Sequence, residues 1–163
     1  MSLLTDEVRA FIGREVTYEA PEPLGAAAIR YFALATGDSN PLYHNEAEAR
    51  QSRFGGIVAP PTFVCETNQY MPGPIRDDGN MGHEWQLPIE NARLLRGGNE
   101  YEFVEPVRAT DQLKVAWRID DIYEKTTDRG ALLFVISEAR YLNQHGRLLA
   151  IDRETNIYQE LRS

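Results

Sequence analysis

Cysteine, basic residues and long apolar runs are all scarce in this chain of 163 residues. The single cysteine, Cys65, excludes an internal disulfide and a paired-cysteine zinc site, and it is compatible with a reducing cytoplasm. Because Cys65 lies in an apolar run, we interpret it as a small buried side chain and not as a nucleophile. Lys and Arg number 17 against 25 Asp and Glu, a net charge of −8. This balance argues against a nucleic-acid-binding protein, because phosphate binding needs basic patches.

Targeting and membrane signals are also missing. The N-terminal residues MSLLTDEVRAF are too acidic for a signal peptide, and no apolar run is long enough to span a bilayer. We therefore expect a cytoplasmic protein that does not bind membranes. The composition, with 42% hydrophobic and 26% charged residues, is that of an ordinary globular chain. The length predicts one domain over residues 1–163.

Helical patterns dominate the first half of the chain. In the alanine-rich segment 24–36, the spacing of Ala28, Tyr31, Phe32 and Ala35 predicts a buried face. The expected helices span residues 4–12, capped by Thr5, then 24–36 and 46–51, and a further one starts at Pro60. A short strand is expected over 14–20, and the Pro- and Gly-rich residues 71–84 are expected to form a loop.

The second half alternates between apolar and polar residues at a spacing of two, which predicts half-buried strands. The expected strands cover residues 99–107, 112–123, 131–142 and 147–158, with tight turns at 126–130 and 143–146. Strands joined by tight turns pair antiparallel. Helices followed by such a meander predict an α+β fold, in which a strongly bent antiparallel sheet holds a central helix.

Polar residues concentrate in one stretch, Tyr31 to Phe63, with the sequence YFALATGDSNPLYHNEAEARQSRFGGIVAPPTF. A helix breaks there at a Gly-Asp pair, and Asp38, Asn40, Tyr43 and His44 crowd into the turn between two apolar segments. A loop held by rigid elements is a common place for catalytic groups. The same residue types also favour plain turns, so the residues alone leave both interpretations open.

The segment GDSNPLYHNEAEARQSRFGGIVAPPTF resembles the signature of MaoC-like hydratases and dehydratases, most closely their N-terminal dehydratase-type domain. The resemblance continues through NEYEFVEPVRATDQLKV, IDDIYEK and ARYLNQHGRLLA, and so covers nearly the whole chain. It implies a hot-dog fold, side-by-side dimers, and action on thioesters of coenzyme A (CoA) or acyl carrier protein. No metal site is expected, because three scattered His and one Cys without a paired-ligand motif do not make one. Adding water to a thioester double bond needs no redox cofactor, and any CoA would be the substrate.

In the resembled family the pattern G-D-x-N-P-[LI]-H supplies an Asp and a His that share one water. Residues 37–42 match this pattern, so Asp38 is implied as catalytic. Tyr43 falls at the position of the His, and His44 follows one residue later. A phenol, with a pKa of about 10, is a poor general base near neutral pH. His44 is the right kind of group, but it reaches the site only if the backbone bulges.

The resembled family also has a His-Gly pair at the start of the central helix, where this chain has Ala59-Pro60. Proline has no N–H, so the donor for the developing enolate oxygen must come from another amide, such as that of Thr62, Gly55 or Gly56. The resemblance implies two catalytic residues, Asp38 and His44, and six substrate-binding residues: Asn40, Tyr43, Gly55, Gly56, Ala59 and Thr62. Further ligand contacts are candidates only, and these are Arg50, Arg53, Arg76, His83 and Trp85.

Three functions remain open at this point. The chain is an (R)-specific enoyl-thioester hydratase or 3-hydroxyacyl-thioester dehydratase acting as the pocket-shaping, weakly catalytic or non-catalytic subunit beside a catalytic hot-dog partner. Alternatively, it is a self-sufficient homodimeric hydratase that uses Asp38 and His44. The third alternative is a thioester-binding scaffold without turnover, or a hot-dog thioesterase. In the resembled family, departures at both catalytic roles mark the half-domain that shapes the acyl pocket.

Overall fold

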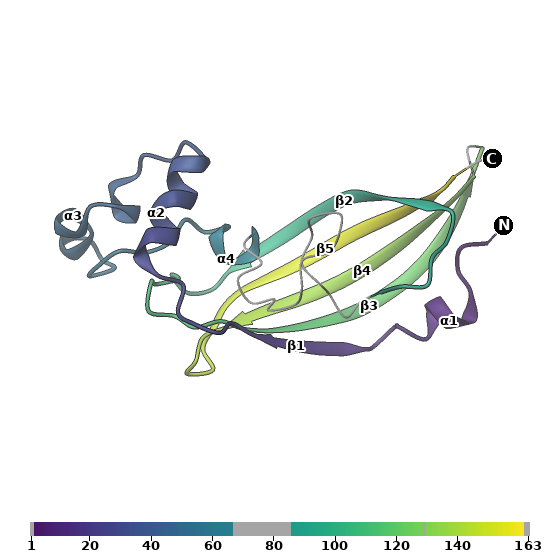
Figure 1. Cartoon of the computed structure of the whole chain (residues 1–163), viewed down its shortest axis with the longest axis horizontal. Coiled ribbons are helices and arrows are strands. Elements are labelled where there is room, and N and C mark those ends of the chain that lie inside the picture. The colour runs from purple at the N-terminus through teal and green to yellow at the C-terminus, as the bar shows by residue number, and fades with distance from the viewer. Residues whose placement is uncertain (1, 67–85, 129, 162–163) are drawn as a thin grey trace.

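The computed structural model describes residues 2–66, 86–128 and 130–161, and it consists of a long curved sheet with a group of short helices beyond one end (Figure 1). The helices are α1 (Asp6–Arg9), α2 (Ala26–Ala35), the 3₁₀ helix η1 (Pro41–Tyr43), α3 (Glu46–Gln51) and α4 (Phe63–Glu66). The strands are β1 (Glu15–Glu19), β2 (Ala92–Phe103), β3 (Lys114–Thr127), β4 (Gly130–Leu142) and β5 (Leu148–Glu160). None of the helices in these described ranges is long and apolar enough to cross a membrane.

The sheet has five strands in the order β1-β3-β4-β5-β2, and every neighbouring pair is antiparallel. The predicted α+β class and the predicted tight turns before and after β4 are confirmed. Strand β4 is central, and its alternate residues Leu133, Val135, Ala139 and Tyr141 are buried. These side chains form the inner face of the sheet. Ala139 and Tyr141 belong to the core cluster of the helical end, and Leu133 and Val135 belong to a second cluster with Leu3 and Val8 of the N-terminal segment.

Strand β2 departs from its predicted bounds. It begins at Ala92, well before the expected Asn99, and ends at Phe103. A register shift between Arg96 and Gly98 interrupts its pairing with β5, and this bulge breaks the alternation by which a strand is recognised.

The helical end of the molecule has its own core. Ile29 and Ala33 of α2, Phe63 and Val64 of α4, and Leu113, which directly precedes β3, are all buried in one cluster. The rings of Phe32 and Phe63 meet edge to face, with centroids 5.3 Å apart. This packing holds the end of α2 and the start of α4 in a fixed relation, and the polar stretch between them is therefore anchored on both sides.

The predicted buried face of α2 was wrong for two of its residues. Tyr31 is 63% exposed and Ala35 is exposed, whereas Ile29 and Ala33 are fully buried. The helix packs along Ile29, Phe32 and Ala33, so its inner face is rotated by about one residue. Alanine side chains are too small to decide which face of a helix packs best, and the larger Ile29 decides it here.

Two other helices are shorter than predicted. Thr5 caps α1 as expected, with its hydroxyl accepting from the Val8 N–H at 3.2 Å, but the helix ends at Arg9. Helix α4 begins at Phe63 and not at Pro60. A proline disfavours helical geometry in the residue before it, so Pro60, followed by Pro61, forms a turn instead. The continuation of this helix, and the loop predicted over residues 71–84, lie outside the described residues.

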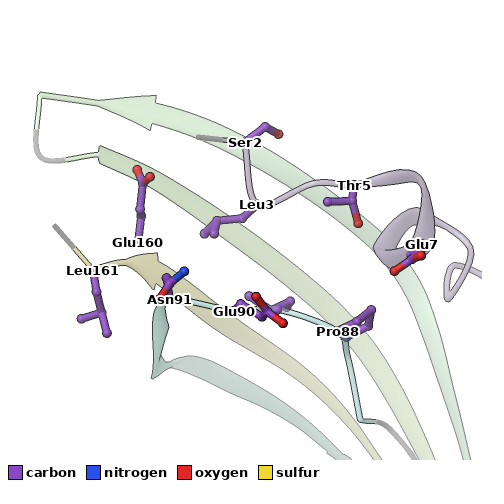
Figure 2. Close-up of a pocket in the computed structure, with 10 residues that line it drawn as sticks. Ser2, Leu3, Thr5, Glu7, Pro88, Glu90, Asn91, Glu160 and Leu161 are labelled. Atoms are coloured by element: carbon purple, nitrogen blue, oxygen red, sulfur yellow. The ribbon is translucent and has the colours of Figure 1, made fainter. Parts of the chain in front are cut away.

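The end of the sheet far from α2 is closed by the N-terminal segment. The N–H groups of Leu3 and Leu4 both donate to the Glu124 carboxylate, at 2.6 and 3.1 Å. A hollow of about 600 Å³ lies there, between the N-terminal residues, residues 88–91 and the end of β5 (Figure 2). Glu90 and Glu160 are among the residues that line it, so its charge is acidic.

Candidate active site

The candidate site begins where α2 ends. The Asp38 N–H donates to the Ala33 carbonyl at 2.8 Å and the Gly37 N–H donates to the Leu34 carbonyl at 3.1 Å, which is a Schellman C-terminus. Gly37 has a φ of 71°, a left-handed conformation that glycine adopts without strain. Asp38 is thereby placed at a fixed position just beyond the helix.

Two consecutive side chains then shape the turn. Asp38 Oδ1 accepts from the Asn40 N–H at 3.0 Å, and Asn40 Oδ1 accepts from the Leu42 N–H at 3.1 Å. Asn40 is thus the N-cap of η1, with Pro41 as its first residue. The Gly-Asp-x-Asn-Pro pattern therefore ends one helix and begins the next, and it holds the Asp38 carboxylate and the Asn40 amide close together.

Tyr43, and not His44, points into the protein. Tyr43 is 9% exposed and belongs to the core cluster, whereas His44 is exposed. Burial and the negative charge of Asp38 raise the pKa of Tyr43, and a hydrogen bond with the Asn40 side chain lowers it in part. The structure therefore brings Asp38, Asn40 and Tyr43 together, and it does not bring His44 into this group.

The second wall of the site runs from Gly55 to Thr62. The Gly55 N–H donates to the Ser52 carbonyl at 3.1 Å, and the Ala59 N–H donates to the Val107 carbonyl at 2.8 Å, so neither amide is available to a ligand. The amides of Gly56 and Thr62 have no acceptor among residues 2–66, 86–128 and 130–161. Of the alternatives to the missing Pro60 donor, these two remain.

The arginines expected near a ligand are occupied elsewhere or not described. Arg50 pairs with Glu46 at 2.7 Å along α3, and the Arg53 guanidinium lies 4.7 Å from the Phe54 ring centroid. Arg76, His83 and Trp85 lie outside the described residues.

Sequence reasoning missed Arg108, whose Nη2 donates to the Phe54 carbonyl at 2.6 Å. No local pattern marks Arg108, because more than fifty residues separate it from Phe54 in the chain.

Metal ligation finds no support in this part of the molecule. In the portion of the chain that the structure describes, no group of three or more His, Cys, Asp or Glu side chains could hold a metal ion. Cys65 is buried, as its apolar surroundings in the sequence predicted.

Comparison with known proteins matches this architecture. The family model described as FAS1-like, dehydratase domain region, matches residues 10–152. A UPF0336 protein from Streptomyces avermitilis is 32% identical over 114 residues, covering 70% of this chain and 72% of that protein. The ChsH1-ChsH2 complex from Mycobacterium tuberculosis superposes with a TM-score of 0.73 at 17% identity, over 96% of this chain and 89% of that one. The unliganded (R)-hydratase PhaJ1 from Pseudomonas aeruginosa gives a TM-score of 0.63 at 21% identity, over 93% of this chain and 83% of that one.

The fold and its structural neighbours define a hot-dog protein, as predicted. The chain belongs to the MaoC-like hot-dog family, through the group described as FAS1-like, dehydratase domain region. The family resemblance seen in the sequence is thereby confirmed.

We expect the Tyr43 phenol to ionise later than an unperturbed tyrosine as alkali is added. Its folded-state pKa is raised, so below about pH 10 the stability linked to the protonated phenol is fully present, and it is lost as the pH rises from there through the raised pKa. Alkaline unfolding should therefore be weaker in Tyr43→Phe than in the wild type.

Absorbance titration of phenolate measures this directly. Tyr43→Phe should remove one late-ionising group from the titration. Tyr158→Phe should remove another and serves as the positive control, because burial and Glu154 also raise the pKa of Tyr158. If Tyr43→Phe instead removed a group that ionises at the ordinary tyrosine pKa, the result would contradict the buried position of Tyr43.

Proposed function

We propose that this chain is the acyl-pocket subunit of an (R)-specific enoyl-thioester hydratase or 3-hydroxyacyl-thioester dehydratase, and that a second hot-dog subunit carries the catalytic Asp and His. The observation that carries the proposal is the inward position of Tyr43 beside Asp38, with His44 on the surface. The chain has the fixed turn of a hydratase site without the base that would complete it.

The chemistry explains why this difference matters. Hydration adds a water oxygen to the β-carbon and a proton to the α-carbon of the enoyl thioester, and so needs a base for the water and a donor for the thioester oxygen. A phenol with a raised pKa stays protonated at neutral pH, so Tyr43 can donate a hydrogen bond but cannot accept a proton from water. Asp38 already accepts the Asn40 N–H. These groups are suited to binding and orienting a thioester, and less suited to activating water.

An exposed apolar edge supports a second subunit. Strand β2 is at one end of the described sheet, and only β5 pairs with it there (Figure 1). Leu94, Leu95, Phe103 and the following Val104 are large apolar residues exposed along this edge. Uncovered apolar edge strands are prone to pair with other chains, and proteins generally cover them. A hot-dog partner placed along β2 would bury these side chains.

The test is a hydration assay with crotonyl-CoA and a longer enoyl-CoA. We expect the purified chain alone to give no turnover above the uncatalysed rate. Addition of a hot-dog partner with an intact G-D-x-N-P-[LI]-H motif should restore it. In the complex, Asp→Asn in the partner's motif should lower kcat by about a hundredfold or more, whereas Asp38→Asn in this chain should retain turnover.

The contrary outcomes are equally specific. Turnover by the chain alone that disappears in both Asp38→Ala and His44→Ala would identify a self-sufficient hydratase and overturn the proposal. Release of free thiol without formation of a 3-hydroxyacyl product would identify a thioesterase instead.

A further inference from the structure

A hollow of about 370 Å³ lies beside the second wall of the candidate site. The segment before β3 forms one side of it, and the turn between β4 and β5 forms the other. Arg108, His145 and Arg147 line it together with two carboxylates, Glu105 and Asp111. The basic residues come from two segments that are far apart in the chain and that meet only in the folded protein.

Buried hydrogen bonds hold the two sides in place. Asp111 is 6% exposed, and its two oxygens accept from the Arg108 N–H at 2.8 Å and from Asn143 Nδ2 at 3.1 Å. Asn143 Oδ1 in turn accepts the N–H groups of His145 at 3.0 Å and Arg147 at 3.1 Å. Each of the three basic residues is thus fixed through its backbone to one buried Asp–Asn pair.

The charges in the hollow are unequally engaged. Both oxygens of Asp111 accept hydrogen bonds inside the protein, so this carboxylate is largely compensated. Glu105 is the other negative group, and its carboxylate lies 3.7 Å from the Arg147 guanidinium, a longer separation than the 2.7 Å of the Arg50–Glu46 pair. The Arg147 side chain is 68% exposed. Its guanidinium therefore retains donors for an anion entering from solvent.

Arg108 connects this hollow to the candidate site. Its Nη2 donates to the Phe54 carbonyl, and its Nη1 would lie 3.9 Å from a Cβ placed on Gly56. Gly56 is one of the residues expected to contact the substrate, and the Val107 carbonyl beside Arg108 holds the Ala59 N–H. The Arg108 guanidinium therefore lies close to Gly56, within reach of a ligand bound at that residue.

We propose that this hollow binds a phosphate group of the carrier that holds the acyl thioester, with Arg147 and Arg108 as its cationic contacts. The inference rests on the proposed function, because it assumes that the ligand is a phosphorylated thioester carrier. A guanidinium presents paired donors that match phosphate oxygens. The large hollow at the other end of the sheet is lined by glutamates and does not offer this chemistry.

Calorimetric binding of CoA and pantetheine tests the subsite in the intact chain. We expect Arg147→Gln to weaken CoA binding by about tenfold, the loss of one charge-assisted contact, and to leave pantetheine binding unchanged. Glu105→Gln should act in the opposite direction and tighten CoA binding by about threefold, because it removes the carboxylate that competes for Arg147. Both side chains are exposed, so both variants should fold normally.

Matched controls carry the same change in net charge outside the hollow. Arg118→Gln removes an arginine paired with Asp120, and Glu100→Gln removes a glutamate beside Arg153. Neither should alter CoA binding. Equal effects of Arg147→Gln and Arg118→Gln, absence of measurable CoA binding, or weaker binding in Glu105→Gln would overturn the proposal.

Two further probes identify which phosphate is bound. If Arg147→Gln weakens the binding of 4′-phosphopantetheine as much as the binding of CoA, the hollow binds the phosphate next to the pantetheine arm. CoA and acyl carrier protein share this phosphate. If Arg147→Gln weakens the binding of CoA but not of dephospho-CoA, the hollow binds the ribose 3′-phosphate. Of the two carriers, only CoA has this phosphate. Each result supports the subsite and names its ligand.

Failure of the subsite and failure of the proposed function are distinguishable. If the complex turns over enoyl-CoA and Arg147→Gln leaves its KM unchanged, the subsite proposal is wrong and the proposed function stands. If Arg147→Gln and Glu105→Gln have opposite effects on CoA binding but no hot-dog complex hydrates enoyl-CoA, the subsite proposal stands and the proposed function is wrong.

Discussion

Phe63→Ala is expected to lower the free energy of unfolding by about 3–5 kcal/mol, the usual loss for truncating a buried phenylalanine. Phe63 is 1% exposed, and its ring meets that of Phe32 edge to face. The change leaves a cavity and removes an aromatic pair at the junction of α2 and α4. Urea denaturation measures the loss, and the melting temperature should fall by roughly 10 °C.

The matched control for this variant is Tyr31→Ala. Tyr31 is an aromatic residue of the same helical region, but it is 63% exposed, and its ring lies against the Arg30 guanidinium, 5.3 Å from the ring centroid. Its removal should change stability by about 0.5 kcal/mol or less. Similar losses in the two variants would mean that the core at the helical end is not organised around Phe63.

Asp111→Ala is the second change with a large expected effect. It leaves the Arg108 N–H and Asn143 Nδ2 without their acceptor in a buried position, and each such orphan costs about 1–3 kcal/mol. We expect a total loss of about 3 kcal/mol in urea denaturation. Asp111→Asn should lose less, because its remaining oxygen can still accept one of the two hydrogen bonds.

The exposed Asp121 of β3 provides the control for Asp111. Asp121→Ala removes the same charge from an exposed position and should leave stability within about 0.5 kcal/mol of the wild type. A comparable loss in Asp121→Ala would indicate a general effect of charge. A stable Asp111→Ala protein with unchanged CoA binding would contradict the role of the Asp111–Asn143 pair in both stability and ligand binding.

The strands were predictable because their period is local. Leu113, Val115 and Ile119 are buried, and each is recognisable from the spacing of two in the sequence alone. The bulge at residues 96–98 hid the first half of β2. There Gly97 lies so close to β5 that an added Cβ would be 2.8 Å from the Thr155 carbonyl oxygen. That constraint comes from a strand more than fifty residues away, so no local window could contain it.

The candidate site was predictable in its turn and not in its orientation. Asp38 and Asn40 form the expected turn because their side chains bond to backbone groups two residues on. Whether Tyr43 or His44 faces inward depends on packing against the rest of the core, where the Val58 N–H ties the next segment to the Leu42 carbonyl at 3.2 Å. The catalytic and binding roles of these residues stay predictions.

The strand order has a consequence for how the protein is made. Strand β2 precedes β3 and β4 in the chain, yet in the described sheet it pairs with β5, from Ala92 opposite Glu160 to Phe103 opposite Ala150. During synthesis, β2 leaves the ribosome without its partner and waits until β5 has been translated. Such distant pairing slows folding and leaves apolar strands exposed in the meantime. Nascent chains of this protein are therefore expected to depend on chaperones until β5 has emerged from the ribosome.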